Sequence, residues 1–174
     1  QVYARPYFNI DGQVFYILDD VPRAASYNIC NFTIPGERPL SLAMPAPPLF
    51  AQNPAAPAVR NFDGVVSTTV TVNRNLMDFY TNYPPCHWSV YAATALTAPV
   101  CGQLYPPLRA AVAGKGEREA AELLLHYLHR AFPYKTDEAQ FGIERTLFAE
   151  EMYYYPYSDC EDRSILFARL VKDL

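Results

Sequence analysis

The spacing of hydrophobic residues changes near residue 105, and this change restricts the chain to folds that combine sheet and helix. Residues 65–72 are dominated by β-branched side chains and form the strongest strand pattern in the sequence. Residues 117–132 instead repeat apolar side chains every three or four positions, as an amphipathic helix does. The sequence therefore predicts an α+β fold, with an antiparallel β module at residues 1–104 and a helical part at residues 105–174.

Other short segments extend the predicted β module. Residues 14–18, 27–34 and 87–92 contain the β-branched and aromatic side chains that are typical of strands. Asp-Gly pairs at residues 11–12 and 63–64 are expected to form turns between strands. These segments together favour several short antiparallel strands.

Two segments of this module are not predicted to be strands. Residues 35–57 are rich in alanine and proline, which favours an extended surface segment over a helix or a central strand. Residues 74–80 are compatible with one helical turn or with a loop. In the helical part, residues 108–113 are expected to form a short helix that ends at Gly114.

The composition excludes several classes of partner. Of 174 residues, 51% are hydrophobic and 18% are charged, which is typical of a chain that folds around a core. The net charge of -4 leaves no positive excess for the phosphates of nucleic acids or for an anionic membrane surface. No apolar run approaches the roughly 20 residues of a membrane-spanning helix. We therefore expect no nucleic-acid partner and no membrane span.

The ends of the chain and its cysteines give further expectations. The chain begins with Gln1 and its last helical pattern continues to Leu174 without a stop signal, which favours a fragment of a longer protein. The spacing of the four cysteines matches neither a zinc site nor a redox pair, so no metal and no cofactor are expected. A bridge between Cys86 and Cys101 and a pair of free thiols both remain open.

One short segment carries the pattern of a helix start beside a cysteine. Ser158 and Glu161 have the spacing of a capping box, in which each side chain accepts a backbone N–H from the other residue. Cys160 then occupies the second position of the helix, where the helix dipole favours a thiolate. The negative charges of Asp159, Glu161 and Asp162 oppose a thiolate. The same charges interact favourably with the helix dipole in the first turn.

The rest of this helix gives an expectation for the direction of the Cys160 side chain. Ser164, Phe167 and Val171 follow Cys160 on one helical face, which we expect to be the packed face. On the residues alone, Cys160 is either an activated nucleophile or a buried structural thiol.

The C-terminal part also resembles a known family. Residues 132–137, 141–145, 149–151 and 155–164 together look like the first half of a bacterial transglutaminase-like core, which shares the papain-like arrangement. The resemblance spans residues 105–174. It implies the helical half of such a core, and the preceding residues resemble the β-sandwich-like accessory modules that precede these cores.

The resemblance implies a function for Cys160. It would be the nucleophile that attacks the amide bond of a peptide or protein substrate to give a thioester, and water or an amine would resolve this intermediate. In the family, the His and Asp partners lie on strands after the cysteine helix. We expect His87, His126 and His129 to be ordinary structural residues, and this chain alone to be inactive. The parent would be a periplasmic or cell-surface protein of a bacterium.

Aromatic and acidic residues near Cys160 have two interpretations. Trp88, Tyr155 and Tyr157 are expected to line the substrate cleft. Glu144 and the Glu150-Glu151 pair are expected to form ion pairs and caps rather than to catalyse proton transfer. The alternative function is a non-catalytic binding or assembly module. A truncated core would expose the apolar face on which its missing strands pack, so we expect the chain to form a homo-oligomer through this face.

Overall fold

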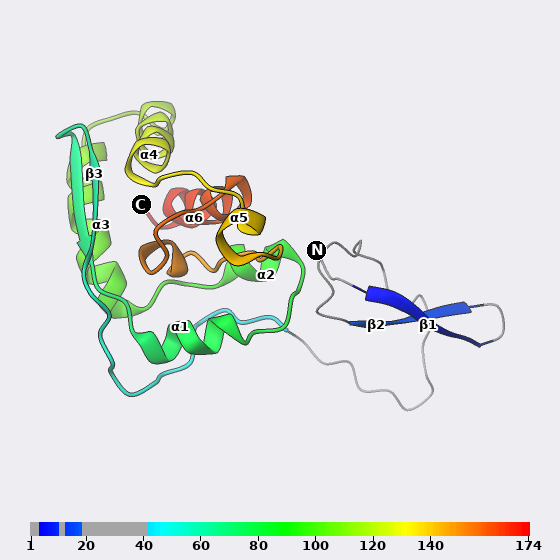
Figure 1. Cartoon of the computed structure of the whole chain (residues 1–174). Coiled ribbons are helices and arrows are strands. Elements are labelled where there is room, and N and C mark those ends of the chain that lie inside the picture. The colour runs from blue at the N-terminus through cyan, green and yellow to red at the C-terminus, as the bar shows by residue number, and fades with distance from the viewer. Residues whose placement is uncertain (1–3, 11–12, 19–41) are drawn as a thin grey trace.

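The computed structural model of the chain describes residues 4–10, 13–18 and 42–174. The strands in these residues are β1 (Ala4–Ile10), β2 (Gln13–Leu18), β3 (Ala58–Phe62) and β4 (Val66–Val70). The helices are α1 (Arg74–Thr81), α2 (Trp88–Ala93), α3 (Ala98–Val112), α4 (Glu117–Ala131), α5 (Asp137–Phe141) and α6 (Cys160–Asp173), with a short 3-10 helix, η1, at Glu151–Tyr153. Figure 1 shows these elements along the chain.

The described strands form two separate antiparallel pairs, β1 with β2 and β3 with β4. The described part of the chain is therefore an α+β structure, as predicted. Residues 27–34 and the turn at residues 11–12 lie outside the described residues, so a β-sandwich stays a prediction.

The β3–β4 hairpin follows directly from its sequence. Asp63 and Gly64 both have positive φ angles, of 43° and 76°, which is the backbone that an Asp-Gly hairpin turn requires. Val66 and Val70 are buried, and Thr68 between them is buried too, while the intervening residues of β4 face solvent. This alternation places one face of the hairpin on the core.

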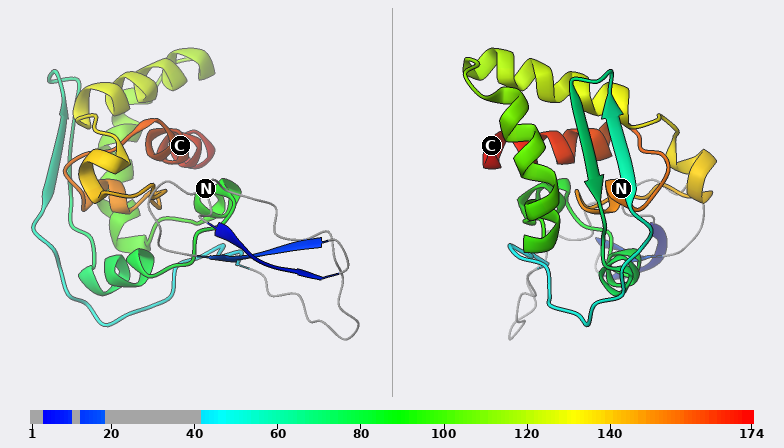
Figure 2. Two further views of the ribbon diagram at one scale, coloured as in Figure 1. Left: turned by 45° about the vertical axis from the view of Figure 1, so that its right-hand side comes forward. Right: turned by 90° about the vertical axis from the view of Figure 1, so that its left-hand side faces the viewer.

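Helix α6 packs against α2 and α4. Figure 2 shows the β3–β4 hairpin lying across α3 and α4, with α6 behind it. β4 packs on α3 and β3 on α4. One hydrophobic cluster runs through these contacts from Val66 to Leu170. α3 passes through residue 105 without a break, so helix and core both continue across the position where the hydrophobic spacing changes.

Residues 88–93 form the helix α2, so the prediction of a strand at residues 87–92 is wrong. The His87 side chain accepts the backbone N–H of Ser89 and so caps α2 at its N-terminus. Tyr91 is buried, while Trp88 remains 62% exposed. The periodicity of such a short apolar segment does not distinguish a strand from a helix, and here the N-terminal cap favours the helix.

Two other helices are longer or better defined than predicted. Residues 74–80 form the helix α1, which Asn73 caps by accepting the backbone N–H of Asn75. The short helix predicted at residues 108–113 is the end of the 15-residue α3, which contains Pro106 and Pro107. The helix survives these prolines because Leu104 and Leu108, four residues apart, are both fully buried.

Several expectations are confirmed without change. α4 is amphipathic, with Leu124, Tyr127 and Leu128 buried and Arg118 and Arg130 exposed. Residues 42–57 contain no helix or strand beyond a single bridge to Asn73. Within the described ranges, no helix has both the length and the apolar character needed to cross a membrane.

A buried chain of hydroxyl groups joins the hairpin to the core, and it gives a test of the fold. The Tyr127 hydroxyl is 2.7 Å from Thr68 Oγ1 and 3.0 Å from the Tyr153 hydroxyl. Tyr127→Phe would leave two buried hydroxyls without this partner, so we expect it to lower the free energy of unfolding by about 1–3 kcal/mol in urea titrations. Tyr154→Phe, at a partly exposed ring, is the control and should change little. Equal unfolding midpoints for the two variants would contradict this account.

Candidate functional site

The first turn of α6 is built by a capping box, one residue later than predicted. The Asp159 side chain accepts the backbone N–H groups of Glu161 and Asp162, at 3.1 and 3.4 Å. The Asp162 side chain in turn accepts the backbone N–H of Asp159 at 3.3 Å. The box predicted from Ser158 and Glu161 is therefore wrong, and Cys160 is the first residue of the helix instead of the second.

Ser158 has another role, which explains why it does not cap the helix. It is buried, and its backbone pairs with the segment before α5, where its N–H donates to the carbonyl of Pro133 at 3.2 Å. Its hydroxyl lies 3.4 Å from Nε of Arg163. Ser158 thus holds two chain segments together immediately before the helix begins.

The Cys160 side chain is exposed, so the expectation that it faces the packed side of the helix is wrong. The buried face of α6 carries Asp162, Ile165, Leu166, Arg169 and Leu170. Of the residues that share the face of Cys160, Ser164 and Val171 are exposed as well, while Phe167 is half-buried and packs against the core. The interpretation of Cys160 as a buried structural thiol is excluded by the same observation. Its sulfur lies 4.0 Å from the hydroxyl of Tyr134.

An apolar hollow adjoins the Cys160 sulfur between α2 and α6. It is lined by Trp88, Ala92, Cys160, Glu161, Ser164, Ile165 and Ala168. Of the aromatic residues predicted to line the cleft, the structure brings Trp88 to Cys160. Tyr155 instead packs on Phe141, and Tyr157 lies under the ammonium group of Lys135. Neither tyrosine lines this hollow.

None of the three histidines has a hydrogen bond to Cys160 among the described residues. His87 Nδ1 lies 2.8 Å from Ser89 Oγ, and the His126 ring stacks on Phe62 with 6.4 Å between centroids. His129 lies exposed near the end of α4.

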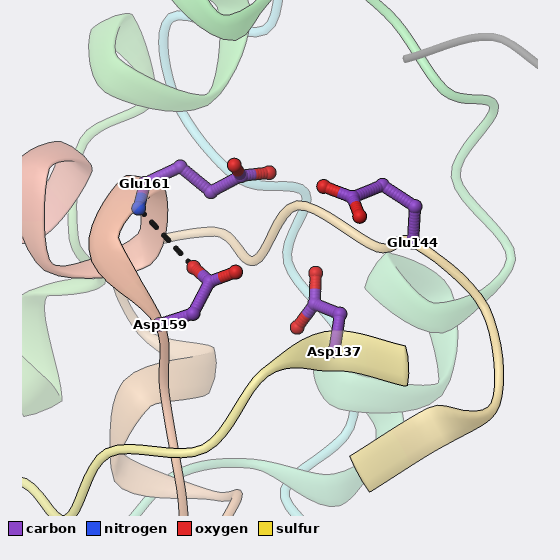
Figure 3. A group of neighbouring side chains, drawn as sticks. All are labelled: Asp137, Glu144, Asp159 and Glu161. Atoms are coloured by element: carbon purple, nitrogen blue, oxygen red, sulfur yellow. Dashed lines mark hydrogen bonds between the residues drawn. The ribbon is translucent and has the colours of Figure 1, made fainter. Parts of the chain in front are cut away.

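A group of carboxylates that the sequence did not indicate surrounds the start of α6. We call Asp137, Glu144, Asp159 and Glu161 the acidic cluster, because one carboxylate oxygen of each lies within 4.8 Å of the others. Figure 3 shows these side chains converging from α5, from the loop after it and from the first turn of α6. They are spread over residues 137–161 without a ligand motif, so only the fold brings them together.

Asp137 is a buried member of the acidic cluster. Its side chain is almost fully buried, and one carboxylate oxygen, Oδ2, accepts the backbone N–H of Arg145 at 2.9 Å. The other oxygen, Oδ1, is buried and has no hydrogen-bond partner. Burial, and then the charges of Asp159, Glu144 and Glu161, raise the pKa of Asp137 to about 7.

Burial also raises the pKa values of the neighbouring carboxyl groups of Asp162 and Glu161. The pKa of Asp162 is raised to about 8, mainly by burial and against the hydrogen bond from the Leu147 backbone N–H. Burial raises the pKa of Glu161 as well, and the charges of Asp159 and Glu144 add to this, although Thr146 donates a hydrogen bond to Glu161 at 3.2 Å. The start of α6 therefore concentrates acidic groups in a partly dehydrated place, where burial favours their protonated forms.

The Glu150-Glu151 pair has the structural role that the sequence predicts. Glu150 accepts hydrogen bonds from the backbone N–H and the hydroxyl of Thr97, which precedes α3. Glu151 is fully buried and forms an ion pair with Arg145. Glu144, which was expected to act in the same way, belongs to the acidic cluster instead.

Comparison of the chain with protein-family models, with curated proteins and with solved structures finds no match. Any functional conclusion therefore depends on the residues at the start of α6 and on the hollow beside them.

The raised pKa values predict how stability depends on pH in a buffer that contains EDTA. Asp137 and Asp162 have pKa values of about 7 and 8 in the folded protein, against an ordinary value of 3.8. The folded state therefore binds more protons than the unfolded state between about pH 4 and 8, and its stability falls as the pH rises through this range. Each carboxyl contributes a slope of up to about 1.4 kcal/mol per pH unit.

Urea unfolding at pH 5, 6, 7 and 8 measures this slope. Asp137→Asn should flatten it, because the amide keeps an oxygen for the Arg145 N–H and carries no charge. A free energy of unfolding that rises between pH 5 and 8 would be inconsistent with the burial of these groups.

Proposed function

We propose that this chain carries the nucleophile of a transglutaminase-like cysteine enzyme that acts on peptide amide bonds, with Cys160 as the attacking group. The observation that carries the proposal is an exposed cysteine at the first residue of a 14-residue helix, beside an apolar hollow. The N-terminus of a helix favours a thiolate through its dipole, and in α6 the dipole acts without free N–H groups at Glu161 and Asp162, because the Asp159 side chain already accepts both. Cysteines that act as nucleophiles occupy such accessible positions.

The chemistry proposed for Cys160 is acyl transfer. The thiolate sulfur bonds to the carbonyl carbon of the substrate amide, the C–N bond breaks, and the amine leaves with a proton from a general acid. Water then attacks the thioester to release a carboxylic acid and the thiol, or a second amine attacks to form a new amide. Because His87, His126 and His129 have no hydrogen bond to Cys160, we assign the role of general acid to none of them.

The hollow supports a peptide as the substrate. Its lining is apolar apart from Glu161 and Ser164, and the exposed ring of Trp88 forms one wall. An apolar side chain of a peptide would bury its surface and that of Trp88 there, which places the adjoining peptide bond near the sulfur. The exposed Trp88 also favours the alternative, a binding module in which the thiol has no chemical role.

Alkylation by iodoacetamide at pH 7.5 separates activation by the helix from simple exposure. The matched control is the double variant Cys160→Ser with Ser164→Cys, which presents a thiol in the same hollow one turn further along α6. We expect Cys160 to react about 2- to 5-fold faster than this control, because the helix dipole acts within the first turn. Cys86 and Cys101 are half-buried and should react more slowly than either thiol. Equal rates at positions 160 and 164 would favour the binding module.

A second experiment tests the hollow as the peptide site. Trp88→Ala should slow the labelling of Cys160 by a chloromethyl ketone peptide with an apolar side chain about 10-fold or more, since it removes the exposed ring. Its labelling by iodoacetamide, which is too small to use the hollow, should not change. Leu125→Ala on α4, also an exposed apolar side chain, is the control. If Trp88→Ala slows both reagents equally, the hollow does not select peptides.

A further inference from the structure

We infer that the acidic cluster is a binding site for a divalent cation, Ca²⁺ by its chemistry, that joins α5 and the loop after it to the first turn of α6. This inference is independent of the role of Cys160. The thiol is not one of the proposed ligands, and the experiments below measure metal binding and stability.

The spacing of the oxygens fits a calcium ion. Calcium binds oxygen ligands at about 2.3–2.6 Å, so two ligands on opposite sides of the ion are about 4.6–5.2 Å apart. One oxygen from each of Asp137, Glu144, Asp159 and Glu161 lies within 4.8 Å of all the others, which is within this diameter. The four oxygens could therefore share one ion with little movement.

The unpartnered oxygen of Asp137 is the second and independent observation. A buried carboxylate oxygen without a hydrogen bond is costly, and folded proteins rarely keep one without a partner. Oδ1 of Asp137 is such an atom, and Figure 3 shows its carboxylate directed toward Asp159, Glu161 and Glu144. A cation between the four groups would be the partner of this oxygen.

No basic side chain of the described residues takes the place of such a cation. The Arg145 guanidinium pairs with Glu151 and lies over the rings of Phe141 and Tyr155. Arg163 donates to the carbonyl of Phe132 at 2.5 Å and lies over Tyr134. The negative charge of the cluster is thus left without a positive group from these two nearby arginines.

The donor set favours Ca²⁺ over other common ions. All four ligands are carboxylates, which are hard oxygen donors, and neither imidazole nor thiolate contributes as in a zinc site. Magnesium requires near-ideal octahedral geometry at about 2.0–2.1 Å, whereas calcium accepts irregular arrangements with longer bonds. Two ligands come from the start of α6 and two from α5 and its loop, so the ion would connect segments that are separate in sequence.

Calorimetric titration and thermal unfolding of the full chain, after treatment with EDTA, test the site. We expect CaCl₂ to bind with one site per chain and a Kd below about 1 mM, within the range of protein calcium sites. At a hundredfold excess over Kd, Ca²⁺ should raise the melting temperature by about 5–10 °C. MgCl₂ at the same concentration should have a clearly smaller effect.

The variant Asp137→Asn separates loss of the site from loss of the fold. Its amide can still accept the Arg145 N–H and can donate to the neighbouring carboxylates, so we expect it to fold and to be at least as stable as the wild type in EDTA. It should lose most of the shift caused by Ca²⁺. Glu119→Gln, an exposed acidic residue of α4, removes the same charge elsewhere and should keep the full shift.

Three results would overturn the inference. The first is a wild-type chain that shows neither heat nor a shift in melting temperature with 10 mM CaCl₂. The second is an undiminished shift in Asp137→Asn. The third is an equal shift with MgCl₂ and CaCl₂, which would indicate a general effect of ionic strength on a crowded acidic surface.

Discussion

The buried carboxyl group of Asp162 fixes where α6 begins and which way the helix faces. It accepts the backbone N–H of Leu147 at 2.8 Å and that of Asp159 at 3.3 Å, so it joins the loop between α5 and η1 to the helix start. Successive helical residues are rotated by about 100°, so a residue two positions away points to nearly the opposite side. Because Asp162 is buried, Cys160 must face outward. The exposure of the candidate nucleophile is thus a consequence of the capping box.

The capping box also brings the carboxylates of the acidic cluster close together. Asp159 must accept N–H groups to cap the helix, and its position beside Asp162 brings Glu161 toward Asp137 and Glu144. Capping stabilises the helix, but the charges that provide it repel one another across a partly buried space. The chain therefore stabilises one helix end by concentrating charge there. A site with raised pKa values and an unpartnered oxygen is the kind of local conflict that accompanies function.

Sequence patterns predicted the parts of the fold that depend on local chemistry. The Asp63-Gly64 turn, the strand at β4 and the stripe of α4 follow from backbone preferences, β-branched composition and periodicity. The helix beginning at Cys160 was predicted within one residue. The buried face of α6 could not be predicted. Two charged side chains, Asp162 and Arg169, lie on it, whereas a prediction from the pattern of apolar residues places charged side chains on the solvent face. The acidic cluster was missed because tertiary packing alone brings its members together.

Glu161 belongs to both features at the start of α6. It lines the hollow beside Cys160, and it is also a member of the acidic cluster. Any group that binds in the hollow and shifts this side chain must change the electrostatic free energy of the cluster. Thermodynamic linkage requires the reverse effect to be equal in size, so a cation at the cluster must alter the affinity of the hollow to the same extent. One glutamate beside a cysteine is sufficient to couple the two sites, because the same residue lines the hollow and contributes its carboxylate to the cluster.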